Sequence, residues 1–182
     1  MKLHAAHPGG WAIFEAQAHA DERGWVAEIL REDALRAHAG ELRVVQQNLS
    51  MSRRGVLRGM HYQLESPQGK LVQVLRGRIH DVIVDLRRDS PDFGRSFAIR
   101  LSGDSLQSLW APPGFAHGFL AMEDSTVLYS LTQPRIAAAE RAIRWNCPQL
   151  GIEWPLAAGQ EPIISERDRA APVFGEAEVY GK

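Results

Sequence analysis

The chain has 182 residues, of which 45% are hydrophobic, and its 21 basic and 22 acidic side chains leave a net charge of −1 at pH 7. This length suits one domain with a sizeable core, and the near-neutral charge argues against a nucleic-acid-binding protein. The single cysteine, Cys147, excludes an internal disulfide, and no apolar run reaches the ~20 residues of a membrane span. The N-terminus lacks the apolar core of a signal peptide, so we expect a cytoplasmic protein with no membrane partner.

In chain order, the predicted elements are mostly short β-strands. Residues 1–42 are expected to hold N-terminal strands and one short helix, Glu32–Ala39, before Gly40. Residues 43–134 form short strand-like runs divided by turn signals, a pattern typical of a jelly-roll core. We expect these strands at 43–51, 56–63, 70–75, 79–86, 97–101, 108–110, 118–122 and 126–132.

Residues 135–182 are rich in Pro and Trp and are expected to wrap this core. One helical turn is expected at 137–141, and another helix is expected to open at Ser165, whose side chain suits an N-cap. The predicted fold class is therefore all-β, a jelly-roll β-sandwich or barrel with a few short peripheral helices. We expect a single domain over residues 1–182.

Residues 55–70, GVLRGMHYQLESPQGK, hold the most chemically informative side chains. Arg58, His61 and Lys70 are costly to bury unless they are paired or bind a ligand, and together they suit an anionic, oxygen-rich molecule. A lone histidine is more often a satisfied strand residue, but the two nearby cations favour a site. Imidazole titrates near ~6.5 and can act as a base at neutral pH. Lys70 is either an ordinary surface lysine or an ammonium that stabilises a developing oxyanion.

A second histidine, His117, follows the Pro-rich turn at 112–116 and is either part of a stiff loop or aimed at the same cavity. Metal-binding jelly rolls commonly pair two histidines one residue apart with a later histidine after such a turn. Here the expected second histidine is Gln63, which leaves a poor divalent-metal set, so we expect no metal and no cofactor. Gln46 and Asn48 share one strand face and either bind a base or sugar or face solvent.

Taken in order, these segments resemble the dTDP-4-dehydrorhamnose 3,5-epimerase family of the cupin superfamily. The resemblance covers nearly the whole chain, at residues 21–24, 46–50, 55–63, 68–72, 81–87, 90–94, 113–119, 151–155 and 165–168. It implies a cupin-type jelly roll that acts on a dTDP-linked 4-keto-6-deoxyhexose without metal or redox cofactor. It also implies a homodimer with an exchanged N-terminal strand.

The resemblance implies a role for each matching residue. His61 corresponds to the base that removes the proton beside the C4 ketone, Asp168 to its carboxylate partner, and Lys70 to the cation that holds the enolate oxygen. Arg58, with help from His117, would face the diphosphate. Further positions that match the nucleotide or sugar cleft are Arg23, Glu28, Gln46, Asn48 and Glu140, with Glu28 expected from the other subunit's exchanged strand.

The chain departs from the family pattern after Tyr129. With Tyr129 and Glu140 aligned, the family's acid tyrosine falls on Arg135 and its motif proline on Ala137. Arginine cannot supply a proton at neutral pH. One alternative is that water, Tyr129 or a shifted loop delivers the proton. The other is that the enzyme inverts a single carbon, with C3 favoured. Arg135 is otherwise expected to bind an extra anionic group of a changed substrate.

Two other functions stay open at this point. The first is a non-catalytic sugar-nucleotide-binding homologue that kept the pocket and lost the acid. The second, weaker alternative is a metal-dependent cupin.

Overall fold

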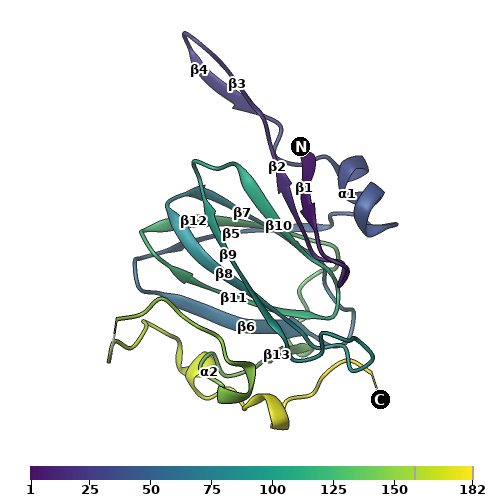
Figure 1. Ribbon diagram of the computed structural model, residues 1–182, viewed down its shortest axis with the longest axis vertical. Helices are drawn as coiled ribbons and strands as arrows, with labels where there is room; N and C mark the ends of the chain where they lie inside the picture. Colours follow the sequence, from purple (N-terminus) through teal and green to yellow (C-terminus); the bar gives the residue numbers. More distant parts are fainter. Residues whose placement is uncertain (158, 182) are drawn as a thin grey trace.

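In the computed structural model, which describes residues 1–157 and 159–181, two antiparallel sheets lie face to face (Figure 1). The six-stranded sheet has the order β1 (Lys2–Ala6), β2 (Ala12–Glu15), β10 (Gln107–Ala111), β7 (Lys70–Arg76), β12 (Ser125–Leu131) and β5 (Gln46–Ser52). The five-stranded sheet has the order β13 (Glu140–Ala142), β6 (Leu57–Gln63), β11 (Phe115–Ala121), β8 (Arg78–Asp85) and β9 (Ser96–Ser102). The predicted all-β class is confirmed.

The core between the sheets is formed by side chains that alternate along each strand and point inward. Strand β8 shows the principle, because Ile79 and Ile83 pack between the sheets while Val82 and Val84 pack on the outer side. The alternation along residues 79–86, where a strand was predicted, therefore separates two apolar faces, both of them covered. This alternation also turns Asp81 inward, where its side chain is fully buried.

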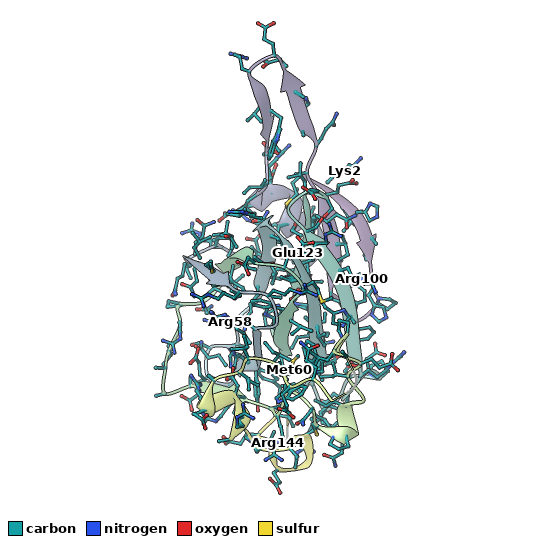
Figure 2. All side chains as sticks on the ribbon, turned by 90° about the vertical axis from the view of Figure 1, so that its left-hand side faces the viewer. Lys2, Arg58, Met60, Arg100, Glu123 and Arg144 are labelled. Carbon is teal, nitrogen blue, oxygen red and sulfur yellow. The ribbon has the colours of Figure 1, made fainter. Side chains whose placement is uncertain are left out.

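The C-terminal segment covers the outer face of the five-stranded sheet (Figure 1). Ile143, Cys147 and Leu150 pack there against Met60 and Val84. Arg144, labelled in Figure 2, lies at the end of the molecule opposite the hairpin formed by β3 (Ala18–Asp21) and β4 (Gly24–Ala27). The segment includes two short 3-10 helices, η1 (Pro148–Leu150) and η2 (Phe174–Glu176). These contacts pack the C-terminal segment against the β-core.

The helices test the local predictions directly. Helix α1 spans Glu32–Ala39 as predicted, and Leu35 is its buried residue. Helix α2 (Glu166–Arg169) begins after Ser165, whose side chain accepts a hydrogen bond from the Asp168 amide, which confirms the predicted N-cap.

Several predicted boundaries differ from the structure; the strand expected at 118–122, for example, is β11 and spans Phe115–Ala121. The turn expected at 137–141 is present at residues 137–139, but residues 140 and 141 belong to β13, because they pair with the free edge of β6. The strand expected from residue 43 begins at Gln46, because the Val44 amide instead donates to the Glu32 side chain.

A hairpin of β3 (Ala18–Asp21) and β4 (Gly24–Ala27) projects away from the two sheets (Figures 1 and 2). Its strands carry large apolar side chains in solvent, since Trp25 is 63% exposed and Val26 is 69% exposed. Within the described residues, no helix combines the length and apolarity needed to cross a membrane.

Candidate active site

A cavity of about 320 Å³ opens between the two sheets. The structure brings seven of the predicted site residues to its wall: Asn48, Arg58, His61, Lys70, His117, Arg135 and Glu140. Side chains that the sequence analysis did not assign to the site, Ser50, Gln68 and Arg167, also line it, together with Tyr129.

Strand β6 presents both Arg58 and His61 to this cavity although they are three residues apart. Strict alternation would place them on opposite faces of the strand. In the pairing with β11, His117 lies opposite His61 and Phe119 lies opposite Arg58, so two residues of β6 face one residue of β11. This β-bulge turns Arg58 to the same side as the imidazole.

Glycines make the bulge possible by letting β6 and β11 approach closely. A Cβ atom built on Gly118 would lie 2.6 Å from Sδ of Met60 and 2.8 Å from the carbonyl oxygen of Arg58. A Cβ on Gly59, whose φ is +130°, would lie 2.5 Å from Cα of Gly118. Both positions therefore require the absence of a side chain.

His61 is hydrogen-bonded to the buried carboxylate of Asp168, with 2.6 Å between Nε2 and Oδ1. Burial raises the pKa of Asp168, but the interactions with His61, together with hydrogen bonds from the Gly59 amide and Ser165, outweigh it and keep the pKa below its usual value. Because Asp168 is ionised, the proton of neutral His61 resides on Nε2. The lone pair of Nδ1 is then the basic group of the ring. The His61 side chain is 34% exposed.

Lys70 approaches the same histidine from the other sheet. Its Nζ donates a hydrogen bond to the backbone carbonyl oxygen of His61 at 3.2 Å. Burial of the ammonium group lowers the pKa of Lys70 to about 8, against the opposing effect of Glu140 and Asp81. The group thus remains mainly cationic at neutral pH, close to where charge on a bound ligand could be stabilised.

A second imidazole–carboxylate couple lies beside the first. Nε2 of His117 is 2.6 Å from Oδ1 of Asp81, and these side chains are 5% and 0% exposed. The second oxygen of Asp81 has no hydrogen-bond partner among the described residues. Arg58 is fixed separately, since its Nε donates to Oγ of Ser52 at 3.0 Å.

Tyr129 enters the cavity from β12, on the sheet opposite His61. Its ring packs edge-on against His117, with 6.0 Å between the ring centroids, and its hydroxyl lies 3.2 Å from that of Ser50. Burial raises the pKa of Tyr129 to about 12, so the phenol keeps its proton at neutral pH. The sequence signal for this position is the alternation of β12, which also turns the buried Val127 and Leu131 inward.

At the cavity mouth, two arginines bind one carboxylate. Arg135 donates to Glu140 through Nε and Nη2, each at 2.7 Å, and Arg167 donates to it through Nη1 at 2.9 Å. Burial raises the pKa of Glu140, but these hydrogen bonds outweigh it and lower the pKa. Arg167 directly precedes Asp168, and that adjacency is the one sequence signal for its position.

The remaining predicted residues divide into two groups. Gln46 and Asn48 share a face as predicted and bond to each other at 2.8 Å, and only Asn48 lines the cavity. Arg23 and Glu28 are not brought to the cavity of their own chain. Arg23 pairs with Asp21 at the hairpin tip, and Glu28 accepts a hydrogen bond from the N-terminal amine at 3.2 Å.

The residues around His61 do not form a metal-ligand set. Nε2 of His61 and Nε2 of His117 each face a carboxylate, and the Gln63 amide bonds to backbone groups of nearby loops. In residues 1–157 and 159–181, no three His, Cys, Asp or Glu side chains are grouped as a metal site. These side chains therefore do not suit a divalent metal ion.

Comparison with known proteins places this chain in a family. A family profile described as dTDP-4-dehydrorhamnose 3,5-epimerase matches residues 8–176. The chain belongs to this family. It is a dTDP-4-dehydrorhamnose 3,5-epimerase-like enzyme, an epimerase of dTDP-linked 4-keto-6-deoxy sugars, and the resemblance found in the sequence is confirmed.

Individual relatives of this epimerase are similar over almost their full lengths. The dTDP-4-dehydrorhamnose 3,5-epimerase of Methanothermobacter thermautotrophicus is 44% identical over 94% of this chain and 93% of its own. The Legionella pneumophila Philadelphia 1 epimerase RmlC, solved with dTDP-4-keto-L-rhamnose, has a TM-score of 0.91 and 37% identity over 97% of this chain and 94% of its own.

A third relative differs in its named activity. It is a double mutant of ChmJ, a 3'-monoepimerase from Streptomyces bikiniensis, solved with dTDP, in which a histidine and a tyrosine are replaced. It has a TM-score of 0.86 and 31% identity over 96% of this chain and 87% of its own.

Proposed function

We propose that the enzyme inverts both C3 and C5 of a dTDP-linked 4-keto-6-deoxyhexose, with His61 as the base and Tyr129 as the acid. One observation carries the proposal: the two sheets present an imidazole–carboxylate couple and a protonated phenol to one cavity. Inversion of a carbon needs a base on one face of the sugar ring and an acid on the other.

The first step is removal of the proton on a carbon next to the C4 ketone. Nδ1 of His61 accepts that proton, the C–H electron pair becomes the C=C bond of an enolate, and negative charge moves onto the C4 oxygen. The Lys70 ammonium stabilises this oxygen, and the carboxylate of Asp168 stabilises the imidazolium that forms. No electrons are gained or lost overall, so the step needs no redox partner.

The second step returns a proton to the opposite face. The phenol O–H of Tyr129 breaks as the new C–H bond forms, and solvent restores the phenol proton while His61 releases its own. The raised pKa of Tyr129 supports this role, because the group is fully protonated before the step. A histidine and a tyrosine are also the residue types replaced together in the ChmJ variant.

Inversion at both carbons follows from the chemistry of the ketone. C3 and C5 flank the same C4 carbonyl, so one ammonium stabilises the enolate formed on either side. Curated relatives at 39–44% identity, such as those of Pseudomonas aeruginosa and Shigella flexneri, are named 3,5-epimerases. The second candidate is a single-site epimerase acting at C3, which Arg135 in place of the family tyrosine and the likeness to a 3'-monoepimerase favour.

Proton exchange with solvent tests the function. The enzyme would be incubated with dTDP-4-keto-6-deoxyglucose in D₂O and the sugar examined by NMR. Deuterium at both C3 and C5 is expected, and deuterium at C3 alone would replace this proposal by the single-site reaction. Incorporation at neither carbon, with dTDP still bound, would identify a non-catalytic homologue. His61→Asn is the control that should abolish incorporation.

We also propose that two chains exchange their hairpins in a homodimer. In a single chain, Arg23 and Glu28 lie on or beside the projecting hairpin, away from the cavity, while Trp25 and Val26 are exposed. A second copy would cover this apolar surface and receive both charged groups at its cleft. Light scattering would show a dimer for the wild type, and Trp25→Ser is expected to shift the mass toward that of one chain.

A further inference from the structure

The segment that carries Arg135 is fixed at the cavity mouth by glutamine side chains. We call residues 133–136 the rim segment, since it leads from β12 toward β13 beside the cavity. Each of its four residues forms a backbone hydrogen bond with a glutamine. Gln68 donates to the Gln133 carbonyl at 2.9 Å, Gln63 donates to the Pro134 carbonyl at 3.3 Å, Gln46 accepts from the Arg135 amide at 2.9 Å, and Gln63 accepts from the Ile136 amide at 2.7 Å.

Gln63 is the central member of this set. Its side chain is buried, with 1% of the residue exposed, and its amide also donates to the Ser66 carbonyl at 2.7 Å. It therefore uses both its donor and its acceptor groups, as a buried amide must if it is not to lose free energy. No other partner for the Arg135 and Ile136 amides occurs among the described residues.

The position of Gln63 connects the rim to the catalytic strand. Gln63 follows His61 by two residues on β6, and in the adjacent strand β13 its register partner is Glu140. Glu140 in turn binds the Arg135 guanidinium through two hydrogen bonds. Gln63 thus connects β6 to the rim backbone through its side-chain amide, and it pairs along the strand with Glu140, whose carboxylate binds Arg135.

We propose that Gln63 is a positioning residue, which holds the rim segment so that Arg135 and Glu140 are preorganised to bind the sugar nucleotide. It touches neither the reacting carbons nor the cavity wall and acts through the rim. The inference rests on the proposed function, since the dTDP-sugar is taken as the ligand. Preorganised binding groups cost less ordering on binding, so loosening the rim should weaken affinity more than it slows the chemistry.

Hydrogen exchange of the backbone tests the structural half of this proposal without any ligand. In Gln63→Met, the amides of Arg135 and Ile136 are expected to exchange at least about tenfold faster than in the wild type, because the Ile136 amide loses its acceptor and the segment loses two anchors. Gln47→Met is the control, because Gln47 donates to Ser130 on the other face of the sheet and leaves the rim untouched. Unchanged exchange in Gln63→Met would overturn the proposal.

Binding and turnover test the functional half. Calorimetric titration with dTDP should give a Kd about tenfold higher for Gln63→Met, whereas kcat for deuterium exchange at saturating sugar should stay within about twofold. Unchanged dTDP affinity, or a loss confined to kcat, contradicts the role of Gln63. A wild type that binds no dTDP contradicts the proposed function instead, and the exchange experiment then still decides whether Gln63 holds the rim.

A second variant covers the case in which Gln63→Met does not fold. Gln63→Glu keeps an acceptor for the Ile136 amide but cannot donate to the carbonyls of Ser66 and Pro134. It is expected to leave the Ile136 amide protected and to weaken dTDP binding less than Gln63→Met. Wild-type affinity in Gln63→Glu together with wild-type exchange throughout the rim would refute the proposal.

Discussion

Asp168 accepts a hydrogen bond from Nε2 of His61 at 2.6 Å, although 107 residues separate the two in the chain. The contact selects the tautomer of the imidazole, because an ionised carboxylate can only accept. Each of these two residues is held in position by its own local structure. Asp168 is placed by helix α2 and its Ser165 cap, and His61 by the bulge of β6.

Replacing Asp168 tests this tautomer selection. Asp168→Asn can donate to Nε2 and favour a proton on Nδ1, which would occupy the basic nitrogen. We expect the rate of deuterium incorporation to fall about 10²–10⁴-fold, the usual contribution of a positioned base. Asp92→Asn, which changes a carboxylate paired with Arg95 outside the cavity, is the control. A rate within threefold of the wild type would argue against the couple.

The lowered pKa of Lys70 predicts an alkaline limb in the pH profile. As pH rises through about 8, Lys70 loses the proton that, in the proposed mechanism, stabilises the enolate oxygen. Activity should then fall about tenfold for each pH unit above that value. Lys70→Arg keeps its charge at all these pH values and should lose the alkaline limb, although its lower overall rate reflects the changed geometry. A flat profile from pH 7 to 10 in the wild type would contradict the role of the ammonium.

Stability should move in the opposite direction over the same range. The pKa of Lys70 falls from 10.5 to about 8 on folding, so between these values the unfolded chain binds more protons. The contribution of Lys70 to the free energy of unfolding therefore increases with pH in this window. Denaturant titrations of the wild type and Lys70→Met at pH 7 and pH 10 measure it. A difference between the two proteins that does not change with pH would refute the linkage.

Tyr129→Phe separates proton removal from inversion. The variant keeps His61 and Lys70, so the α-proton should still exchange with D₂O on the face of the base. Formation of the epimer should fall by at least about 10²-fold, because no phenol remains to protonate the other face. Tyr62→Phe is the matched control, since that buried phenol donates to the Glu178 carbonyl outside the cavity. Epimer formation at the wild-type rate would transfer the acid role to water.

Gly118→Ala tests the close approach of β6 and β11. The new methyl would lie within 3 Å of Met60 Sδ and of the Arg58 carbonyl oxygen. We expect a loss of about 1–3 kcal/mol in the free energy of unfolding, as in other overpacked cores, and reduced activity because Arg58 and His61 shift apart. Chemical denaturation and the deuterium exchange assay measure the two effects. Wild-type stability would show that the strands can separate at no cost.

Local sequence patterns were enough to predict much of the fold. The helix at 32–39 and the two faces of residues 79–86 follow from spacing alone, because each depends on neighbours a few residues away. The bulge that turns Arg58 and His61 to one side was not predictable from alternation, since it depends on the register with β11. Strand β13 was missed for a similar reason, because only the free edge of β6 selects a strand there.

For the site as well, residues marked by their local sequence were predictable, and contacts between distant residues were not. His61, Lys70 and Arg58 attract attention as costly groups in a short strand-rich stretch, whereas the pairing of His61 with Asp168 came only from the family resemblance. Arg167 carries no local pattern that marks it as a site residue. Arg167 lies at the cavity mouth because α2 places Asp168 next to His61. The preceding residue of the helix, Arg167, then lies within hydrogen-bond distance of Glu140.

The mouth of the cavity holds two guanidinium groups and one carboxylate, so an incoming molecule meets one surplus positive charge there. A nucleotide diphosphate carries the opposite sign and is drawn toward the opening before any specific contact forms. The encounter rate should therefore slow as added salt screens this attraction over a distance of ~8–10 Å, while the uncharged sugar gains nothing from it. The phosphates of the ligand therefore govern the rate at which it reaches the cavity, whereas its ketone governs the reaction that follows.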